Sequence, residues 1–382
     1  CILEYNEEKP SKNTAVVVAD PSNGEILGMA SYPTFNLNDP RKLTGMYTDE
    51  EIKDMSDEEY RNNLYSLWTN YCVSESYEPG STFKPVTVAS ALEEGVVKDG
   101  DTYVCKGFET VADYKLKCHV FSTIGSHGSL TVEQALMNSC NPYMIHLALE
   151  MGNSRFAYYQ SLFGFGKITG IDLPGETTGI VYGDRMTTID AACNSFGQTI
   201  NVNMMQMMAA YCSIINGGML YQPHIVKRIE SANGEVVKEY KANLVRQTIT
   251  ASTSKLLRRY LKNTVEEGTA KKAGVTGYSV AGKTGTAQKG DRKDNKWIIS
   301  FIGHAPAENP KFAIYVVIDE PYGTTGTSGS SADVLTLTHN VLEKLLPYMN
   351  VYKDASDEYE DTSSSPDELT VDGIPAGTAS SN

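Results

Sequence analysis

The sequence has 382 residues and a formal net charge of -14, with 41% hydrophobic and 21% charged residues. This length allows one large domain or two ordinary domains with a substantial core, and the composition excludes a fibrous or wholly disordered chain. The acidic balance argues against a nucleic-acid partner, because phosphate binding requires an excess of Lys and Arg on one face.

The two ends of the chain differ from its middle. No run of about eighteen apolar residues occurs, and no secretory signal pattern opens the sequence. Because the first residue is Cys1 rather than Met, we expect the chain to be a fragment of a longer protein and residues 1–13 to be a remnant linker. Eight acidic residues and no Lys or Arg occur from Asp354 to Asp372, so we expect residues 349–382 to form a disordered tail.

The remaining domain, residues 14–348, has strand signals at both ends. Residues 14–30 contain two apolar runs around a Pro-Ser-Asn-Gly turn, which predicts a hairpin. Further strands are predicted over residues 278–288, 297–304 and 312–319. Helices are predicted from apolar periodicity over residues 131–151, 203–215 and 252–267. This order predicts an α+β fold, in which terminal hairpins pair in one antiparallel sheet and helices cover it.

A candidate nucleophile lies in the segment EPGSTFKP, residues 78–85, which precedes an apolar helical run. A serine hydroxyl is a poor nucleophile until a base removes its proton, and a desolvated lysine can serve as that base. Ser81 and Lys84 would share one face of a helix N-terminus, provided that Pro85 lies in the first turn. The pattern also occurs by chance, as in STSK at residues 252–255, where we interpret Ser252 as a helix cap.

Two later motifs strengthen the interpretation of Ser81 and Lys84 as catalytic residues. Ser139-Cys140-Asn141 follows 58 positions after Ser81, and Lys283-Thr284-Gly285-Thr286 follows a further 144 positions later. The sequence thereby resembles the penicillin-recognising serine enzymes, whose Ser-x-x-Lys, Ser-x-Asn and Lys-Thr-Gly motifs occur in this order. The resemblance covers nearly the whole domain and is strongest to the class B penicillin-binding proteins. It implies the fold shared by penicillin-binding transpeptidases and serine β-lactamases.

The resemblance implies a role for each motif residue. Ser81 would be the nucleophile and Lys84 its base, with a pKa lowered by the neighbouring charge of Lys283. Ser139 would relay a proton to the leaving group, and Asn141 would hold the substrate amide. Lys283 would supply positive potential, and Thr284 or Thr286, flanking Gly285, would bind the substrate carboxylate. The backbone amides of Ser81 and Thr286 would form an oxyanion hole.

The implied activity is that of a peptidoglycan D,D-transpeptidase. Ser81 would be acylated by a D-Ala-D-Ala stem peptide or by a β-lactam, and an amine of a neighbouring stem peptide would accept the acyl group. Catalysis would need no cofactor. The resemblance also implies that a missing N-terminal membrane anchor and pedestal region precede residues 1–13. It further implies an extracytoplasmic location and a polytopic membrane glycosyltransferase as partner. The alternatives are a β-lactamase or β-lactam sensor of the same fold, a D,D-carboxypeptidase, and a non-catalytic scaffold for wall synthesis.

A second cluster of reactive residues lies before the Ser-x-Asn motif. Cys105, Cys118 and His119 are suitable zinc ligands, although their spacing matches no standard zinc motif. A Cys105–Cys118 disulfide and a pair of buried free thiols are the alternatives. We interpret His127 as part of a turn that shapes the cleft. The residues available as a fourth zinc ligand are Asp101, Asp113, His127 and Cys140.

Overall fold

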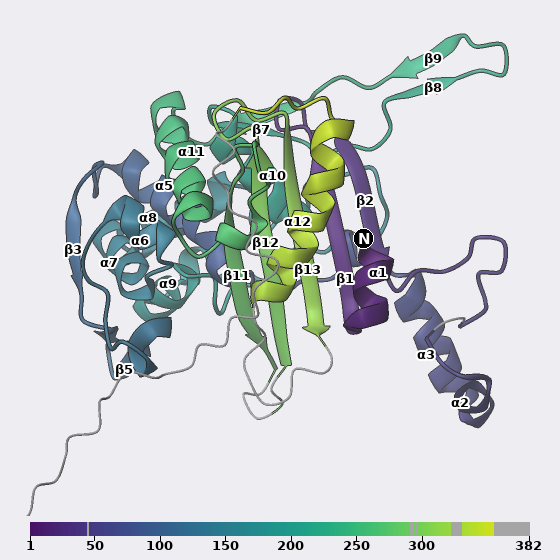
Figure 1. Cartoon of the computed structure of the whole chain (residues 1–382), viewed down its shortest axis with the longest axis horizontal. Coiled ribbons are helices and arrows are strands. Elements are labelled where there is room, and N and C mark those ends of the chain that lie inside the picture. Colours follow the sequence, from purple (N-terminus) through teal and green to yellow (C-terminus); the bar gives the residue numbers. More distant parts are fainter. Residues whose placement is uncertain (44–45, 291–293, 295, 322–330, 355–382) are drawn as a thin grey trace, which may run out of the picture.

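The computed structural model describes all residues except 44–45, 291–293, 295, 322–330 and 355–382. A five-stranded antiparallel sheet joins the two ends of the chain (Figure 1). Its strands, in spatial order, are β11 (Ala281–Lys289), β12 (Lys296–Ala305), β13 (Phe312–Pro321), β1 (Ser11–Ala19) and β2 (Ile26–Tyr32). The N-terminal hairpin therefore pairs with the C-terminal strands, and the predicted α+β fold is confirmed.

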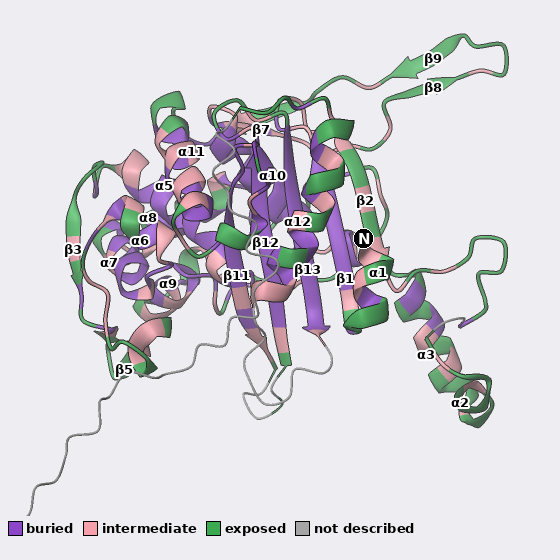
Figure 2. Ribbon diagram, in the orientation of Figure 1, coloured by how far each residue is buried: buried purple, intermediate pink, exposed green. Residues whose placement is uncertain are grey.

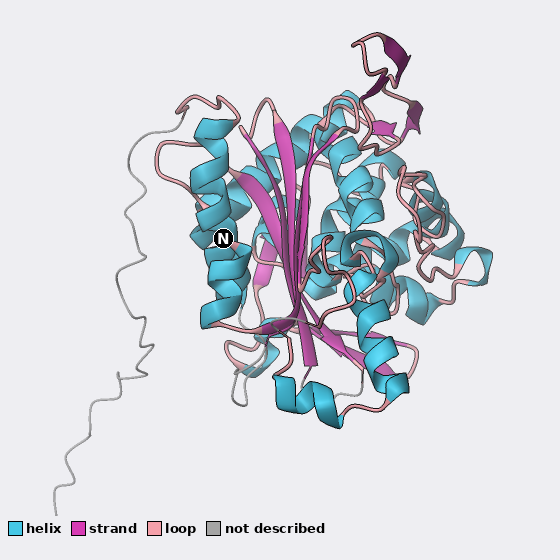
Figure 3. Ribbon diagram, turned by 90° about the vertical axis from the view of Figure 1, so that its right-hand side faces the viewer, coloured by secondary structure: helices cyan, strands magenta, loops and turns pink. Residues whose placement is uncertain are grey.

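Helices bury both faces of this sheet (Figure 3). Successive side chains of a strand point to opposite faces, and in β13 Ile314 and Val316 enter one core while Tyr315 and Val317 enter the other. The first core is closed by α12 (Ser331–Tyr348) and α1 (Ile2–Glu8). The second, larger core contains α5 (Lys84–Glu94), α7 (Asn141–Met151) and α10 (Met204–Ile215).

The predicted helix over residues 131–151 is divided in two. Helix α6 (Val132–Met137) ends before Ser139, and α7 begins at Asn141. The predicted helices near 203–215 and 252–267 are observed as α10 and α11 (Ala251–Glu266). The cap of α11 is Thr250, whose hydroxyl accepts a hydrogen bond from Thr253 N, so the interpretation of Ser252 as the cap was wrong.

The smaller elements surround this body. Helices α4, α8 and α9 complete the helical layers, and α2 and α3 form an arm with its own small apolar cluster (Figure 1). The ribbon β8–β9 projects from the molecule and is largely exposed (Figure 2). Their bounds are α2 (Asp49–Asp54), α3 (Asp57–Trp68), α4 (Tyr71–Ser74), α8 (Asn153–Leu162), α9 (Thr188–Asn194), β7 (Met219–Tyr221), β8 (Arg228–Glu230), β9 (Val236–Glu239) and β10 (Leu244–Gln247).

The two ends differ from their predicted character where the structure describes them. Residues 2–8, expected to belong to a linker, form α1, and Ile2 and Tyr5 pack against the core beneath α12. Near the other end Val351 is buried, and the Asp354 carboxylate accepts a hydrogen bond of 2.7 Å from Ser279 N. The rest of the predicted tail lies outside the described residues. Among the helices that are described, none has both the length and the apolar character needed to cross a membrane.

Candidate active site

Ser81 lies at the entrance to α5, in a short 3-10 turn, η1 (Gly80–Phe83), which leads directly into the helix. Gly80 makes this turn with a φ of +56°, a conformation that glycine adopts without steric penalty. Pro85 falls in the first turn of α5, where its missing N–H costs no intrahelical hydrogen bond. Ser81 is partly exposed, which a nucleophile at this position would require.

Lys84 begins α5 and is completely buried. Its Nζ donates to the Ser139 carbonyl at 2.6 Å and to Asn141 Oδ1 at 2.7 Å, and lies 2.9 Å from Ser139 Oγ. Burial lowers the pKa of Lys84 to about 8. Loss of solvation is therefore the main cause of this shift, and the neighbouring charge that we expected from Lys283 is not among its causes.

Ser139 and Asn141 lie on the opposite wall, where the chain passes from α6 to α7. Ser139 has a φ of +54°, a left-handed conformation that is uncommon for a residue with a β-carbon. The conformation is held by neighbours, since Ser139 N donates to Leu136 O and Cys140 N donates to Ala135 O. Strained residues of this kind concentrate at functional sites. The bend explains why one predicted helix is observed as two.

The third motif lies on β11, which forms the edge of the sheet beside the Ser81 turn. Lys283 is completely buried, and its Nζ donates to the Thr284 carbonyl at 3.1 Å. Burial, with a smaller contribution from Lys84, lowers the pKa of Lys283 well below its usual value. Gly285 is required sterically, because a β-carbon there would lie 2.8 Å from Pro79 O and 2.6 Å from Ser300 Oγ.

The two segments that carry the predicted oxyanion-hole amides lie against each other. A β-carbon added to Gly80 would lie 2.6 Å from Thr286 O and 3.3 Å from Thr286 N. Because Ser81 directly follows Gly80, the turn that contains both residues packs on the backbone of Thr286. Close contact at this point depends on glycine in both segments, Gly80 and Gly285.

Sequence reasoning missed Thr269, which joins two walls of the site. Its Oγ1 lies 3.5 Å from Thr284 Oγ1, and both its backbone N–H and its hydroxyl donate to Met137 O at 3.2 Å. Met137 ends α6, just before the Ser-x-Asn motif. No motif marks Thr269, so only the packing of the segment after α11 reveals its place.

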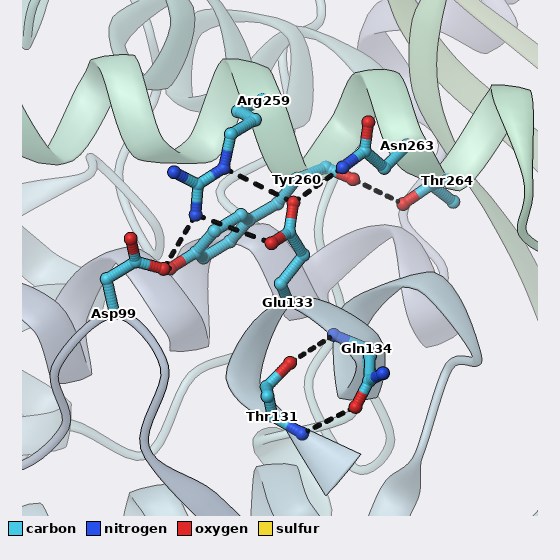
Figure 4. Close-up of polar contacts among 8 residues, drawn as sticks. All are labelled: Asp99, Thr131, Glu133, Gln134, Arg259, Tyr260, Asn263 and Thr264. Carbon is cyan, nitrogen blue, oxygen red and sulfur yellow. Dashed lines mark hydrogen bonds and ion pairs between the residues drawn. The ribbon is translucent and has the colours of Figure 1, made fainter.

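A polar network fixes α6, and with it the wall that carries Ser139, to α11 (Figure 4). Arg259 of α11 forms ion pairs with Asp99 at 2.6 Å and with Glu133 at 3.3 Å. Asn263 donates to Glu133, and Tyr260 donates to Asp99. At the start of α6, Thr131 and Gln134 form a reciprocal capping box. These contacts orient the short α6, whose six residues could not form a stable helix alone.

Three cysteines and one histidine converge beside the same motif. One ligand atom each from Cys105, Cys118, His127 and Cys140 lies within 4.8 Å of all the others. His127 Nδ1 is 3.5 Å from Cys118 Sγ and 3.8 Å from Cys105 Sγ. A tetrahedral zinc site, with Zn–S of about 2.3 Å and Zn–N of about 2.0 Å, separates two sulfur ligands by roughly 3.8 Å and a sulfur from a nitrogen ligand by roughly 3.5 Å. The donor set and the two distances from His127 therefore fit zinc.

The structure favours His127 over His119, the histidine that we predicted as a ligand. His119 is exposed, and although its Nδ1 lies 3.9 Å from Cys118 Sγ, it is not part of the converging group. His127 takes its place because strand β6 (Gly128–Thr131) pairs with β3 (Thr102–Cys105) in the register Cys105↔Gly128. The ribbon of β4 (Phe108–Val111) and β5 (Tyr114–Lys117) separates Cys105 from Cys118 in the sequence. All seven cysteines are free thiols in the structure.

The sequence matches the family described as penicillin binding protein transpeptidase domain over residues 14–341. Together with the sheet, the helices and the three motifs, this match defines the class of the protein. The chain belongs to the transpeptidase family of the penicillin-binding proteins, as its resemblance to the class B members predicted.

Named relatives agree with this assignment. The chain is 38% identical over 356 residues to stage V sporulation protein D of Bacillus subtilis, with 91% of this chain and 51% of that protein covered. It is 30% identical over 351 residues to peptidoglycan D,D-transpeptidase FtsI of Escherichia coli, with 90% and 53% covered. The chain thus spans about half the length of these two curated relatives.

Solved structures share the fold. Penicillin-binding protein 3 of Mycobacterium tuberculosis, in complex with aztreonam, is 27% identical and superposes with a TM-score of 0.77, with 93% of this chain and 77% of that chain covered. The D,D-transpeptidase domain of a peptidoglycan glycosyltransferase from Eggerthella lenta is also 27% identical, with a TM-score of 0.76 and with 92% and 81% covered.

Proposed function

We propose that this domain is a serine D,D-transpeptidase that cross-links peptidoglycan stem peptides and is acylated by β-lactams at Ser81. One observation carries the proposal: Lys84, one helical turn from Ser81, is buried and contacts both Ser139 and Asn141. The buried Lys283 and the Gly285 backbone lie on the neighbouring strand, against the Ser81 turn. These contacts between three motifs that are far apart in the sequence support the proposal.

The first half-reaction forms the acyl-enzyme. Ser81 Oγ attacks the carbonyl carbon of the penultimate D-Ala while neutral Lys84 accepts the hydroxyl proton. The backbone amides of Ser81 and Thr286 stabilise the developing oxyanion. When the peptide bond breaks, the departing D-Ala nitrogen takes a proton through Ser139. The ester on Ser81 and free D-Ala are the products.

The second half-reaction transfers the acyl group. The amine of a neighbouring stem peptide attacks the ester carbonyl and loses its proton to the Lys84–Ser139 pair. Collapse of the tetrahedral intermediate forms the cross-link and returns a proton to Ser81 Oγ. Lys283 contributes positive charge once the substrate is bound. Its lowered pKa favours the neutral form while the site is empty. A substrate carboxylate beside Thr284 and Thr286 would raise this pKa and favour the protonated form.

Covalent labelling tests the nucleophile. We expect a fluorescent penicillin to label the chain with a stoichiometry near one, and peptide mass spectrometry to place the adduct on Ser81. A Ser81→Ala variant should not be labelled, whereas Ser252→Ala, in the second Ser-x-x-Lys sequence, should be labelled normally. Labelling of the Ser81→Ala variant at the wild-type rate would overturn the proposal.

Product analysis separates the proposed activity from its chemical alternatives. With a D-Ala-D-Ala peptide and an amino acceptor, a transpeptidase releases D-Ala and forms a cross-linked dimer. A carboxypeptidase releases D-Ala without forming the dimer, and a β-lactamase hydrolyses the penicillin adduct within minutes. A non-catalytic scaffold forms no adduct. Each of these last three results would contradict a transpeptidase.

We further propose that Cys105, Cys118, His127 and Cys140 hold a structural zinc ion. Cys140 is the middle residue of the Ser-x-Asn motif, so the ion would attach the strands β3 and β6 to the wall that carries Ser139 and Asn141. Three thiolates and one imidazole are a common structural zinc set, and such sites stabilise the folded state directly. The ion has no role in the acyl-transfer steps.

Metal analysis of protein purified without chelator tests this second proposal. We expect about one zinc ion per chain in the wild type and in His119→Ala, and a large loss of zinc in His127→Ala and Cys118→Ser. Removal of the metal should also lower the melting temperature by several degrees. Zinc retained by His127→Ala but lost by His119→Ala would reverse the ligand assignment, and an intact mass 2 Da lower without metal would indicate a disulfide.

We also propose that the complete protein works outside the cytoplasmic membrane beside a polytopic glycosyltransferase. Membership of a cell-wall transpeptidase family supports this location, because the stem-peptide substrates are found there. The proposal predicts that a reporter fused after residue 354 of the complete protein is active only on the outer side of the membrane. It also predicts that a membrane glycosyltransferase copurifies with the complete protein.

A further inference from the structure

The turn that carries Ser81 is held between two backbone segments. On one side Gly80 packs against Thr286 of β11, as described above. On the other side Gly80 N donates to Gly197 O at 3.0 Å, and a β-carbon at Gly197 would lie only 2.0 Å from Gly80 O. The loop that contains Gly197 therefore sets the position of the turn relative to the oxyanion-hole strand.

This loop contains a strained residue. Thr199 has a φ of +59°, which is unfavourable for a β-branched side chain. Conformations of this kind cost of order 1–3 kcal/mol and persist only where neighbouring groups impose them. The conformation of Thr199 must therefore be held by specific contacts.

Two side chains make these contacts. The Glu78 carboxylate accepts a hydrogen bond of 2.8 Å from Thr199 N. Asn194, which is completely buried, donates to Thr199 Oγ1 at 2.9 Å and to Gln198 O at 3.1 Å. Glu78 belongs to the segment that leads into Ser81, only two residues before Gly80. The carboxylate thus ties the strained loop back to the turn that the loop supports.

The same loop also forms one wall of a cavity beside Thr286. This cavity, of about 470 Å³, is lined by Glu78, Gln198, Thr199 and Asn201 on one side and by Ala287 and Lys289 of β11 on the other. A change in the loop would therefore alter both the support of the Ser81 turn and the space next to the oxyanion-hole strand.

We propose that Glu78 is a positioning residue for acylation, because its carboxylate holds Thr199 and the Gly197–Thr199 loop in the conformation that aligns the Ser81 turn with Thr286. The inference rests on the proposed function of Ser81. It assigns Glu78 no contact with the substrate. Loss of the hydrogen bond lets Thr199 relax, and the misplaced turn then slows attack by Ser81.

Four variants test this role: Glu78→Ala, Glu78→Gln, the double variant Glu78→Ala/Thr199→Gly, and Glu75→Ala as the control. Glu75 is an exposed carboxylate on the same segment. The measurement is the second-order rate constant for acylation by a fluorescent penicillin, together with the labelled fraction at completion. We expect Glu78→Ala to be slowed tenfold to a hundredfold while still reaching full labelling.

The remaining variants should stay within threefold of the wild type. Glu78→Gln keeps an oxygen acceptor for Thr199 N. In the double variant, glycine adopts the left-handed conformation without strain, so the loop no longer depends on the carboxylate. If Glu78→Ala does not fold, Glu78→Asp replaces it, because the shorter side chain withdraws the carboxylate; it should be slowed and should be rescued by Thr199→Gly in the same way.

The outcomes are distinguishable. A wild-type rate in Glu78→Ala, or a slowed rate that Thr199→Gly does not rescue, would overturn the positioning role while Ser81 remains labelled. A reduced labelled fraction with an unchanged rate would indicate that Glu78 contributes only to folding, and would also overturn it. Failure of the wild type to label at Ser81 would instead contradict the proposed function itself.

Discussion

Lys84 Nζ lies 2.9 Å from Ser139 Oγ, although 55 positions separate the two residues in the sequence. If neutral Lys84 is the base, the acylation rate should rise about tenfold per pH unit below the Lys84 pKa of about 8 and level off above it. The rise follows because protonated Lys84 cannot accept the Ser81 proton. Stopped-flow acylation between pH 6 and pH 9 measures this profile.

Two lysine variants complete this first test. Lys84→Ala should lose on the order of 10²–10⁴-fold in acylation rate. Lys255→Ala, at the exposed lysine of the second Ser-x-x-Lys sequence, should react normally. A flat wild-type rate over this pH range would contradict the assignment of Lys84 as the base.

Gly285→Ala should impair both stability and acylation. The added methyl group would lie 2.6 Å from Ser300 Oγ and 2.8 Å from Pro79 O, so β11 or the Ser81 turn must move. Overpacking of this kind typically costs about 1–3 kcal/mol. The matched control is Gly28→Ala in β2, where the added methyl group would lie 4.0 Å from Val18. Gly285→Ala should unfold at a lower urea concentration and be acylated more slowly than Gly28→Ala. Equal stability and equal acylation rates in the two variants would show that the structure around Gly285 accommodates the added methyl group.

Ser139→Gly should separate stability from activity. Glycine adopts the φ of +54° without strain, whereas alanine does not. The free energy of unfolding of Ser139→Gly should therefore exceed that of Ser139→Ala by about 1 kcal/mol. Ser139→Gly lacks the hydroxyl beside Lys84 Nζ, so acylation should nevertheless fall by about a hundredfold. Thermal melting and acylation rates give both quantities. Wild-type acylation in Ser139→Gly would exclude a role for the hydroxyl.

The buried His304 should make the free energy of unfolding depend on pH. Burial lowers its pKa to about 3, and the ring is neutral between Tyr211 OH at 2.8 Å from Nδ1 and Ala307 O at 3.1 Å from Nε2. The His304 ring binds a proton more readily in the unfolded chain than in the folded one. Its contribution to the free energy of unfolding is therefore complete above pH 6.5 and is lost as the pH falls toward 3. Between pH 7 and pH 5 the loss should be about 2 kcal/mol.

Unfolding free energies of two histidine variants check this assignment. His304→Gln should lose less stability between pH 7 and pH 5 than the wild type, because it has no ring to protonate. His119→Gln, at an exposed histidine, should keep the wild-type dependence. If His304→Gln loses as much free energy of unfolding between pH 7 and pH 5 as the wild type, groups other than His304 cause the loss of stability in acid.

The features that could be predicted from the sequence are those with a local or motif signal. The hairpin at residues 14–30, the strands near β12 and β13, and Pro85 in the first turn of α5 follow from periodicity and turn chemistry. The three motifs marked Lys84, which contacts both Ser139 and Asn141, and strand β11, which lies against the Ser81 turn. That the N-terminal hairpin and the C-terminal strands share one sheet followed from the strand signals at both ends of the domain, whereas the specific pairing of β1 with β13 did not.

The features that could not be predicted depend on tertiary contacts. The left-handed conformation of Ser139 is imposed by the packing of α6 and α7, and no local pattern marks it. His127 joins the cysteines only through the register of β3 with β6. Thr269 reaches Thr284 because the segment after α11 folds back over the site. Each of these depends on distant parts of the chain, whose arrangement a local pattern does not encode.

The strand order has a consequence for how this domain folds during synthesis. Strand β1 is synthesised well before its partner β13, which runs from Phe312 to Pro321 and pairs with it in the register Ala19↔Ala313. Pairing of such distant segments is slow, because a long loop must close before the contacts form. The strand that carries Lys283 and Gly285 is also made late and depends on the same sheet. A nascent chain therefore contains Ser81, the proposed nucleophile, long before the sheet beside it can form. Any copy that stops short of β13 should be unable to bind penicillin covalently.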